Sequence, residues 1–96
     1  MKEDQVKTVY KFVLCADNYQ TVNMPPGSKV LTAQVQREKV CIWALVDPND
    51  TRRIDYPVWV YGTAHPVTDV VSGRYVATVQ LAGGELVFHV FVGLGA

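Results

Sequence analysis

Short runs that alternate apolar and polar residues follow one another along most of this sequence, and each run ends at turn-forming residues. The turn signals are the segments 16–18, 25–28, 37–39, 47–50, 65–66, 72–73 and 83–84. Period-two runs bounded by such residues are typical of β-strands, and no sustained 3.6-residue apolar period indicates a helix. The pattern predicts seven antiparallel strands, at about 6–15, 20–24, 29–36, 40–46, 53–62, 74–82 and 85–92.

The Gly83-Gly84 pair predicts a hairpin whose register can be assigned. A two-residue type I′ turn needs positive φ at both positions, which suits glycine. Such a turn would place opposite each other Leu81 and Leu86, Val79 and Phe88, Ala77 and Val90, and Tyr75 and Val92. This face is wholly apolar, and we expect it in the core. The other face mixes polar and apolar groups, and it pairs Gln80 with Val87, Thr78 with His89, and Val76 with Phe91.

A second hairpin is expected around Arg37-Glu38, and it has the same two-faced character. Its core face would hold Leu31, Ala33, Val35, Val40, Ile42, Ala44 and Val46. Its other face would carry Val30, Thr32, Gln34, Gln36, Lys39, Cys41, Trp43 and Leu45. Large aromatic residues such as Trp43 are unusual on a plain solvent face. The mixed faces of both hairpins therefore either meet another subunit or line a groove for a ligand.

Candidate binding residues follow from these mixed faces, and they are Gln34, Trp43, Thr78, Gln80 and His89. In a pocket their polar groups would contact a ligand, whereas between subunits they would have to satisfy one another. The strand at 53–62 contains Pro57, which cannot donate a ladder hydrogen bond, so we expect this strand at a sheet edge or with a bulge. Trp59 and Tyr61 on that strand offer a further contact surface.

Composition and charge narrow the fold class and the function. The chain has 96 residues, 49% of them hydrophobic, which is the size of one domain, here 1–96. Its 18 Val against 6 Leu favour strands. We therefore expect a single all-β domain, an antiparallel sandwich or barrel. Because nine basic and nine acidic residues cancel, nonspecific binding of duplex DNA is not expected.

Membrane segments, a secretory leader and metal or cofactor sites are not expected either. The longest apolar stretch, 86–94, is far shorter than the roughly 20 residues that span a bilayer. The charged start of the sequence predicts a cytoplasmic protein, in which Cys15 and Cys41 would be free thiols that fill the core. No metal-ligand spacing, nucleophile elbow or glycine-rich phosphate loop occurs. We accordingly expect a protein that is not an enzyme and holds no cofactor.

Arg52-Arg53 is the one adjacent basic pair in the sequence and the candidate anion site. Guanidinium groups bind phosphate or carboxylate in a bidentate way, and the nearby rings of Tyr56, Trp59 and Tyr61 could stack on a nucleobase. The alternative for the arginines is internal pairing with Asp47, Asp50 or Asp55. His65, at the exit of the strand, is either a binding group or a partner of the loop backbone.

Three segments carry a family resemblance: Cys-Ile-Trp-Ala-Leu-Val at 41–46, Tyr-Gly-Thr-Ala-His-Pro at 61–66, and Gly-Gly-Glu-Leu-Val-Phe-His-Val-Phe at 83–91. With them the chain resembles a family of short, functionally uncharacterised proteins of bacteriophages and prophages. The resemblance covers nearly the whole chain from Tyr10 onward. It implies a small phage-type accessory protein in the host cytoplasm, and it assigns no activity to any residue.

Two hypotheses for the function follow. In the favoured one, the protein sequesters a small anionic, nucleotide-like signal of host antiviral defence, held by Arg52, Arg53 and the candidate residues above. In the alternative, it is an interaction or assembly protein that binds a host or virion protein through an exposed sheet face. Both are compatible with a homo-oligomer, with a dimer as the expected state.

Overall fold

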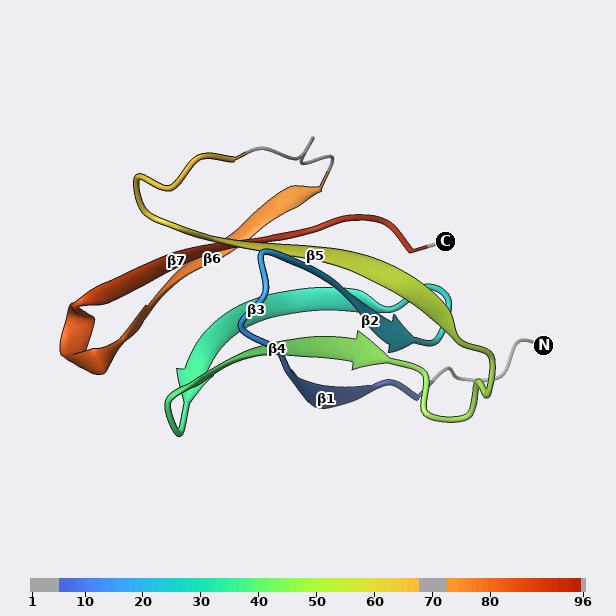
Figure 1. The fold of residues 1–96 in the computed structure, drawn as a ribbon. Helices are drawn as coiled ribbons and strands as arrows, with labels where there is room; N and C mark the ends of the chain where they lie inside the picture. The colour runs from blue at the N-terminus through green and yellow to red at the C-terminus, as the bar shows by residue number, and fades with distance from the viewer. Residues whose placement is uncertain (1–5, 68–72, 96) are drawn as a thin grey trace.

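A computed structural model of the chain describes residues 6–67 and 73–95, and it confirms a small all-β sandwich of two antiparallel sheets (Figure 1). Sheet A has the order β1-β4-β3, with β1 at Thr8–Val13, β4 at Lys39–Val46 and β3 at Lys29–Gln36. Sheet B has the order β2-β5-β7-β6, with β2 at Tyr19–Met24, β5 at Ile54–Gly62, β7 at Leu86–Val92 and β6 at Arg74–Leu81. The sheets do not close into a barrel. No helix in the described part of the chain is long and apolar enough to cross a membrane.

The core lies between the two sheets and is built from the valine-rich positions of the strands. Sheet A contributes Val30, Ala33, Ile42, Ala44 and Val46, and sheet B contributes Val22, Met24, Tyr56, Val58, Val60, Val79, Val90 and Val92. Branched side chains pack well on a pleated surface, which explains why valine dominates. Because successive strand residues point to opposite faces, the residues between these core positions form the outer faces of the sandwich.

The β6–β7 hairpin has the turn expected from its two glycines. Gly83 and Gly84 take φ values of 66° and 96°, and the Glu85 amide donates to the Ala82 carbonyl at 3.2 Å. This closes the type I′ turn, within the short 3-10 segment η1 (Ala82–Gly84). The expected pairs Leu81 with Leu86, Val79 with Phe88, and Ala77 with Val90 are confirmed.

A bulge near Val76 changes the register at the start of β6. Tyr75 was expected opposite Val92 in the core, but it pairs with Phe91 instead, and Arg74 takes the place opposite Val92. Val76, expected on the mixed face opposite Phe91, is half-buried and packs against the core. An extra residue in one strand reverses the alternation on that side of the bulge, so Tyr75 moves to the outer face.

In the β3–β4 hairpin, too, a bulge shifts the register from the expected one. Arg37 and Glu38 form its turn with φ values of 53° and 63°, and the expected register holds from the turn to Ala33 and Ile42. A bulge between Val30 and Thr32 then shifts it. Leu31, expected in the core, is 45% exposed, whereas Val30, expected on the other face, is 3% exposed.

Two further expectations were wrong. Strand β5 lies inside sheet B, between β2 and β7, and not at an edge. Pro57 is tolerated because it lies beyond the last β5–β7 ladder pair, Val58 with Val92, where its carbonyl accepts the Gly93 amide at 2.9 Å. A residue's N–H and C=O point to the same side of a strand, so the missing N–H removes no bond to β2. Cys15 does not fill the core: it is exposed, and only Cys41 is buried.

Candidate interaction site on the outer face of sheet B

Four aromatic rings cross the outer face of sheet B in one line, one from each strand. Tyr19 pairs with Trp59, Trp59 with Phe91, and Phe91 with Tyr75. We call Tyr19, Trp59, Phe91 and Tyr75 the aromatic row. Ring centroids are 5.6 Å apart for Tyr19 and Trp59 and 5.3 Å apart for Tyr75 and Phe91, distances at which aromatic pairs attract each other.

Exposure differs along the aromatic row. The two end rings, Tyr19 and Tyr75, are each 48% exposed, whereas Trp59 is 5% exposed. Phe91, on the inner strand β7, is half-buried. The row therefore presents two accessible tyrosines, fixed by the rings between them. The bulge near Val76 completes it, because without that bulge Tyr75 would lie in the core.

A polar cluster centred on His89 adjoins the aromatic row on the same face. His89 Nε2 lies 2.7 Å from Thr63 Oγ1, and Nδ1 lies 3.3 Å from both Tyr75 Oη and Thr78 Oγ1. Hydroxyl groups can donate or accept, so they can serve both nitrogens of a neutral imidazole. The cluster thereby holds the ring of His89 and the exposed Tyr75 in position.

Six of the ten residues proposed from sequence come together on or beside this face: Trp59, Tyr61, His65, Thr78, Gln80 and His89. Trp59 and Tyr61 are 5% and 2% exposed, so neither ring offers a face on which a nucleobase could stack. His65 lies in the turn after β5, where its amide donates to the Gly62 carbonyl at 3.1 Å. This backbone bond leaves both interpretations of the His65 side chain as predictions.

The other four proposed residues lie elsewhere. Gln34 and Trp43 are on the outer face of sheet A, on β3 and β4, so they share no pocket with the residues of sheet B. Arg52 and Arg53 lie in the loop between β4 and β5. The fold therefore does not bring all ten residues together in one pocket.

Arg52 is paired internally with Asp50, one of the partners named in the alternative interpretation. Arg52 Nε and Nη2 donate to the two carboxylate oxygens of Asp50 at 3.0 and 2.8 Å. These side-chain hydrogen bonds, with one from the Arg52 amide, lower the pKa of Asp50 to about 2 and raise the pKa of Arg52. Arg53 Nη1 donates to the carbonyls of Asp50 and Arg52. The guanidinium of Arg52 is thus already occupied by a carboxylate.

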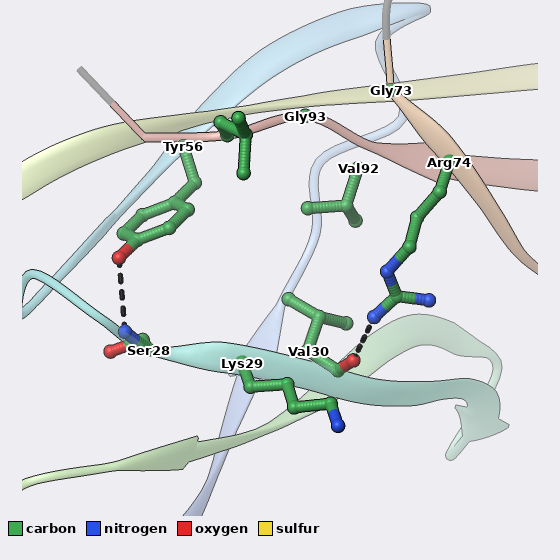
Figure 2. Close-up of a pocket in the computed structure, with 9 residues that line it drawn as sticks. Ser28, Lys29, Val30, Tyr56, Gly73, Arg74, Val92 and Gly93 are labelled. Carbon is green, nitrogen blue, oxygen red and sulfur yellow. Dashed lines mark hydrogen bonds between the residues drawn. The ribbon is translucent and has the colours of Figure 1, made fainter.

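Two cavities open at other places in the sandwich. One of about 350 Å³ lies where β3 approaches the start of β6 (Figure 2) and is bordered by Tyr56, Arg74 and Val92. The other, of about 550 Å³, lies between the two hairpin ends and the connection from β1 to β2, with Val40, Leu86 and Phe88 in its apolar lining. Neither cavity is lined by a residue of the aromatic row.

Sequence reasoning missed three members of the aromatic row as site residues: Tyr19, Tyr75 and Phe91. The alternation already indicated Phe91, because it placed this ring on the mixed face. Tyr75 carried no such signal, since nothing in the sequence marks the bulge. Tyr19 could be recognised only from the pairing of β2 with β5, which joins segments far apart in the chain.

Comparison with known proteins gives one match. A family model described as Domain of unknown function (DUF7352) matches residues 5–95. No curated protein and no solved structure matches the chain.

Proposed function

We propose that this chain, which belongs to the DUF7352 family, is a non-enzymatic binding protein that docks a protein partner on the outer face of sheet B. The observation that carries this proposal is the aromatic row, one ring on each of four neighbouring strands. Tyrosine and tryptophan are enriched among the residues that dominate the binding free energy of protein interfaces. The rigid, accessible rings of Tyr19 and Tyr75 are the anchors that such an interface uses.

The surroundings of the row define the chemistry of the partner. Hydroxyl and amide groups dominate the rest of this face, among them Thr21, Thr78 and Gln80. The one carboxylate that the described strand residues place on it, Asp55, accepts a hydrogen bond from Asn23 at 2.8 Å. A face with so little charge suits a partner surface that offers apolar side chains to the tyrosines and polar backbone groups to the hydroxyls.

A protein partner fits this face better than the nucleotide-like ligand favoured from the sequence. Small-molecule sites are concave, whereas the aromatic row lines neither of the two cavities, and the guanidinium of Arg52 is bound to Asp50. The interaction protein, which was the alternative from sequence, is therefore the function we propose. The resemblance to phage proteins adds the finer proposal that the partner is a host or virion protein met in the host cytoplasm.

The test compares one double variant with a control variant on the other sheet. Tyr19→Ala combined with Tyr75→Ala removes both exposed anchors, and Tyr10→Ala removes a ring that is 44% exposed on β1 of sheet A. Each tagged variant is expressed in the organism that encodes the chain, and co-purified proteins are quantified by mass spectrometry. We expect a protein that copurifies stoichiometrically with the wild type and with Tyr10→Ala, and that is lost from the double variant.

Light scattering on the purified chain tests whether the partner is a second copy of this chain, because that complex would have the mass of a dimer. We expect such a dimer, if that is the complex, to dissociate in the double variant and to persist in Tyr10→Ala. Equal recovery of every copurified protein by all three chains, together with an unchanged mass, would overturn the proposal. Circular dichroism of each variant checks that the sandwich is intact.

A further inference from the structure

The cavity between the two sheets at β3 and β6 is lined by basic and by apolar side chains (Figure 2). Val30, Val92 and the ring of Tyr56 form apolar walls, and Leu94 also belongs to the lining. The side chain of Arg74 extends from β6 across the opening toward β3. The cavity of about 350 Å³ is within the size range of small-molecule pockets.

Two basic side chains line this cavity, Lys29 and Arg74, and the guanidinium donors of Arg74 are largely unused. One Nη2 hydrogen bond runs to the Val30 carbonyl. No carboxylate in residues 6–67 and 73–95 lies within salt-bridge distance of this guanidinium, in contrast to Arg52 with Asp50. A guanidinium has five N–H donors and binds phosphate or carboxylate through two parallel hydrogen bonds. Several donors of Arg74, which is an exposed residue on the cavity lining, are therefore without an acidic partner among the described residues.

Hydrogen bonds fix the Tyr56 wall of the cavity, and a close backbone contact fixes the start of β6. The hydroxyl of Tyr56 donates to the Pro25 carbonyl at 2.9 Å and accepts the Ser28 amide at 3.0 Å. At Gly73 a β-carbon would lie 2.4 Å from the carbonyl carbon and oxygen of Val92. Only glycine allows β6 to start this close to the end of β7, and that approach sets the position of Arg74.

We propose that this cavity binds a small organic anion, with its phosphate or carboxylate group on Arg74 and its planar or apolar body against Tyr56, Val92 and Leu94. A nucleotide has this chemistry, so the ligand class expected from the sequence is assigned here to a place other than Arg52 and Arg53. This cavity is separate from the aromatic row. The proposal that it binds an anion is therefore independent of the proposal that the aromatic row binds a protein.

A purely structural role for Arg74 makes a different prediction. The bond to Val30 ties β6 to β3, so its loss would lower the stability of the free chain whether or not an anion binds. Anion binding instead raises the melting temperature only when the ligand is present, because a ligand that binds the folded state alone stabilises it by mass action. The two roles are thus separated by the ligand-dependent part of the shift.

The experiment measures melting temperatures of the full chain with inorganic phosphate, benzoate, adenosine, adenosine monophosphate, ADP-ribose, and cyclic di- and trinucleotides. We expect at least one organic anion to raise the melting temperature by about 10 °C when it is present at about 100 times its Kd. Adenosine, which lacks the anionic group, should give no shift. Arg74→Met should abolish the shift, and Arg74→Lys should reduce it.

The matched control is Arg52→Met combined with Arg53→Met, which removes two positive charges outside the cavity and should leave the shift unchanged. If Arg74→Met does not fold, the wild type still decides the question by NMR. The Nε–Hε resonance of Arg74 should move on titration with the anion, while that of Arg52 stays in place. No shift with any anion, a shift that persists in Arg74→Met, or equal movement of both resonances would overturn the site.

Discussion

Removal of the Tyr56 hydroxyl tests how much its buried hydrogen bonds contribute to the stability of this domain. Tyr56→Phe removes the hydroxyl alone. Tyr56 is buried in the core, where its hydroxyl donates to the Pro25 carbonyl at 2.9 Å and accepts the Ser28 amide at 3.0 Å. These two bonds hold the connection from β2 to β3 against the centre of sheet B. The substitution keeps the ring and therefore opens almost no cavity.

The expected loss of stability depends on which hydrogen bonds the Pro25 carbonyl and the Ser28 amide keep after the substitution. A hydrogen bond of this kind contributes about 0.5–1.5 kcal/mol net, and an orphaned buried group costs more. Pro25 keeps the Ser28 hydroxyl at 2.7 Å, and the Ser28 amide keeps a long bond to Pro25 at 3.3 Å. Because neither partner is orphaned, we expect Tyr56→Phe to lower the free energy of unfolding by about 1–2 kcal/mol.

Urea denaturation measures this loss, with Tyr10→Phe as the control. Tyr10 is 44% exposed on β1, and its hydroxyl makes no hydrogen bond within the described residues, so the control should stay within a few tenths of a kcal/mol of the wild type. The denaturation midpoint of Tyr56→Phe should fall with an unchanged m-value. A loss no larger than that of Tyr10→Phe would refute the reasoning.

Three further predictions concern the backbone, the thiols and the acidic loop. Gly73→Ala should lower the free energy of unfolding by about 1–3 kcal/mol in urea denaturation, because its β-carbon would collide with the backbone of β7. A thiol reagent should modify one cysteine of the native chain, the exposed Cys15, and reach the buried Cys41 only after unfolding. The pKa of Asp50 is lowered from 3.8 to about 2 by Arg52, so its contribution to stability should be complete above about pH 4 and vanish as the pH falls through 2. Midpoints of the wild type and Asp50→Asn, compared across this range, should converge at the acidic end.

Alternation and turn chemistry are sufficient to locate the strands of this fold. The bounds of all seven lie within two residues of those expected, because a half-buried strand repeats every two residues and its ends need turn-forming residues. The type I′ turn at Gly83 and Gly84 could be predicted for the same local reason. Pairings between distant segments, such as β2 with β5, leave no comparable local pattern.

The errors in the predicted strand register lie at the two bulges. Leu31 and Val76 are ordinary apolar residues in strands, and nothing in their type indicates that the chain inserts an extra residue there. One of these bulges brings Tyr75 to the aromatic row and Arg74 to the cavity edge. The sequence could therefore predict most residues of the outer face, but not the ring that completes the row or the guanidinium of the cavity.

Photo-crosslinking inside cells tests the proposed interaction surface most directly. Benzoylphenylalanine replaces Tyr19, Tyr75 or, as a control of similar exposure on the other sheet, Tyr10, and adducts are identified by mass spectrometry after irradiation. We predict that positions 19 and 75 crosslink to the same protein, and that position 10 does not. Different adducts at 19 and 75, the same adduct at all three positions, or none at 19 and 75 would contradict a partner bound across the aromatic row.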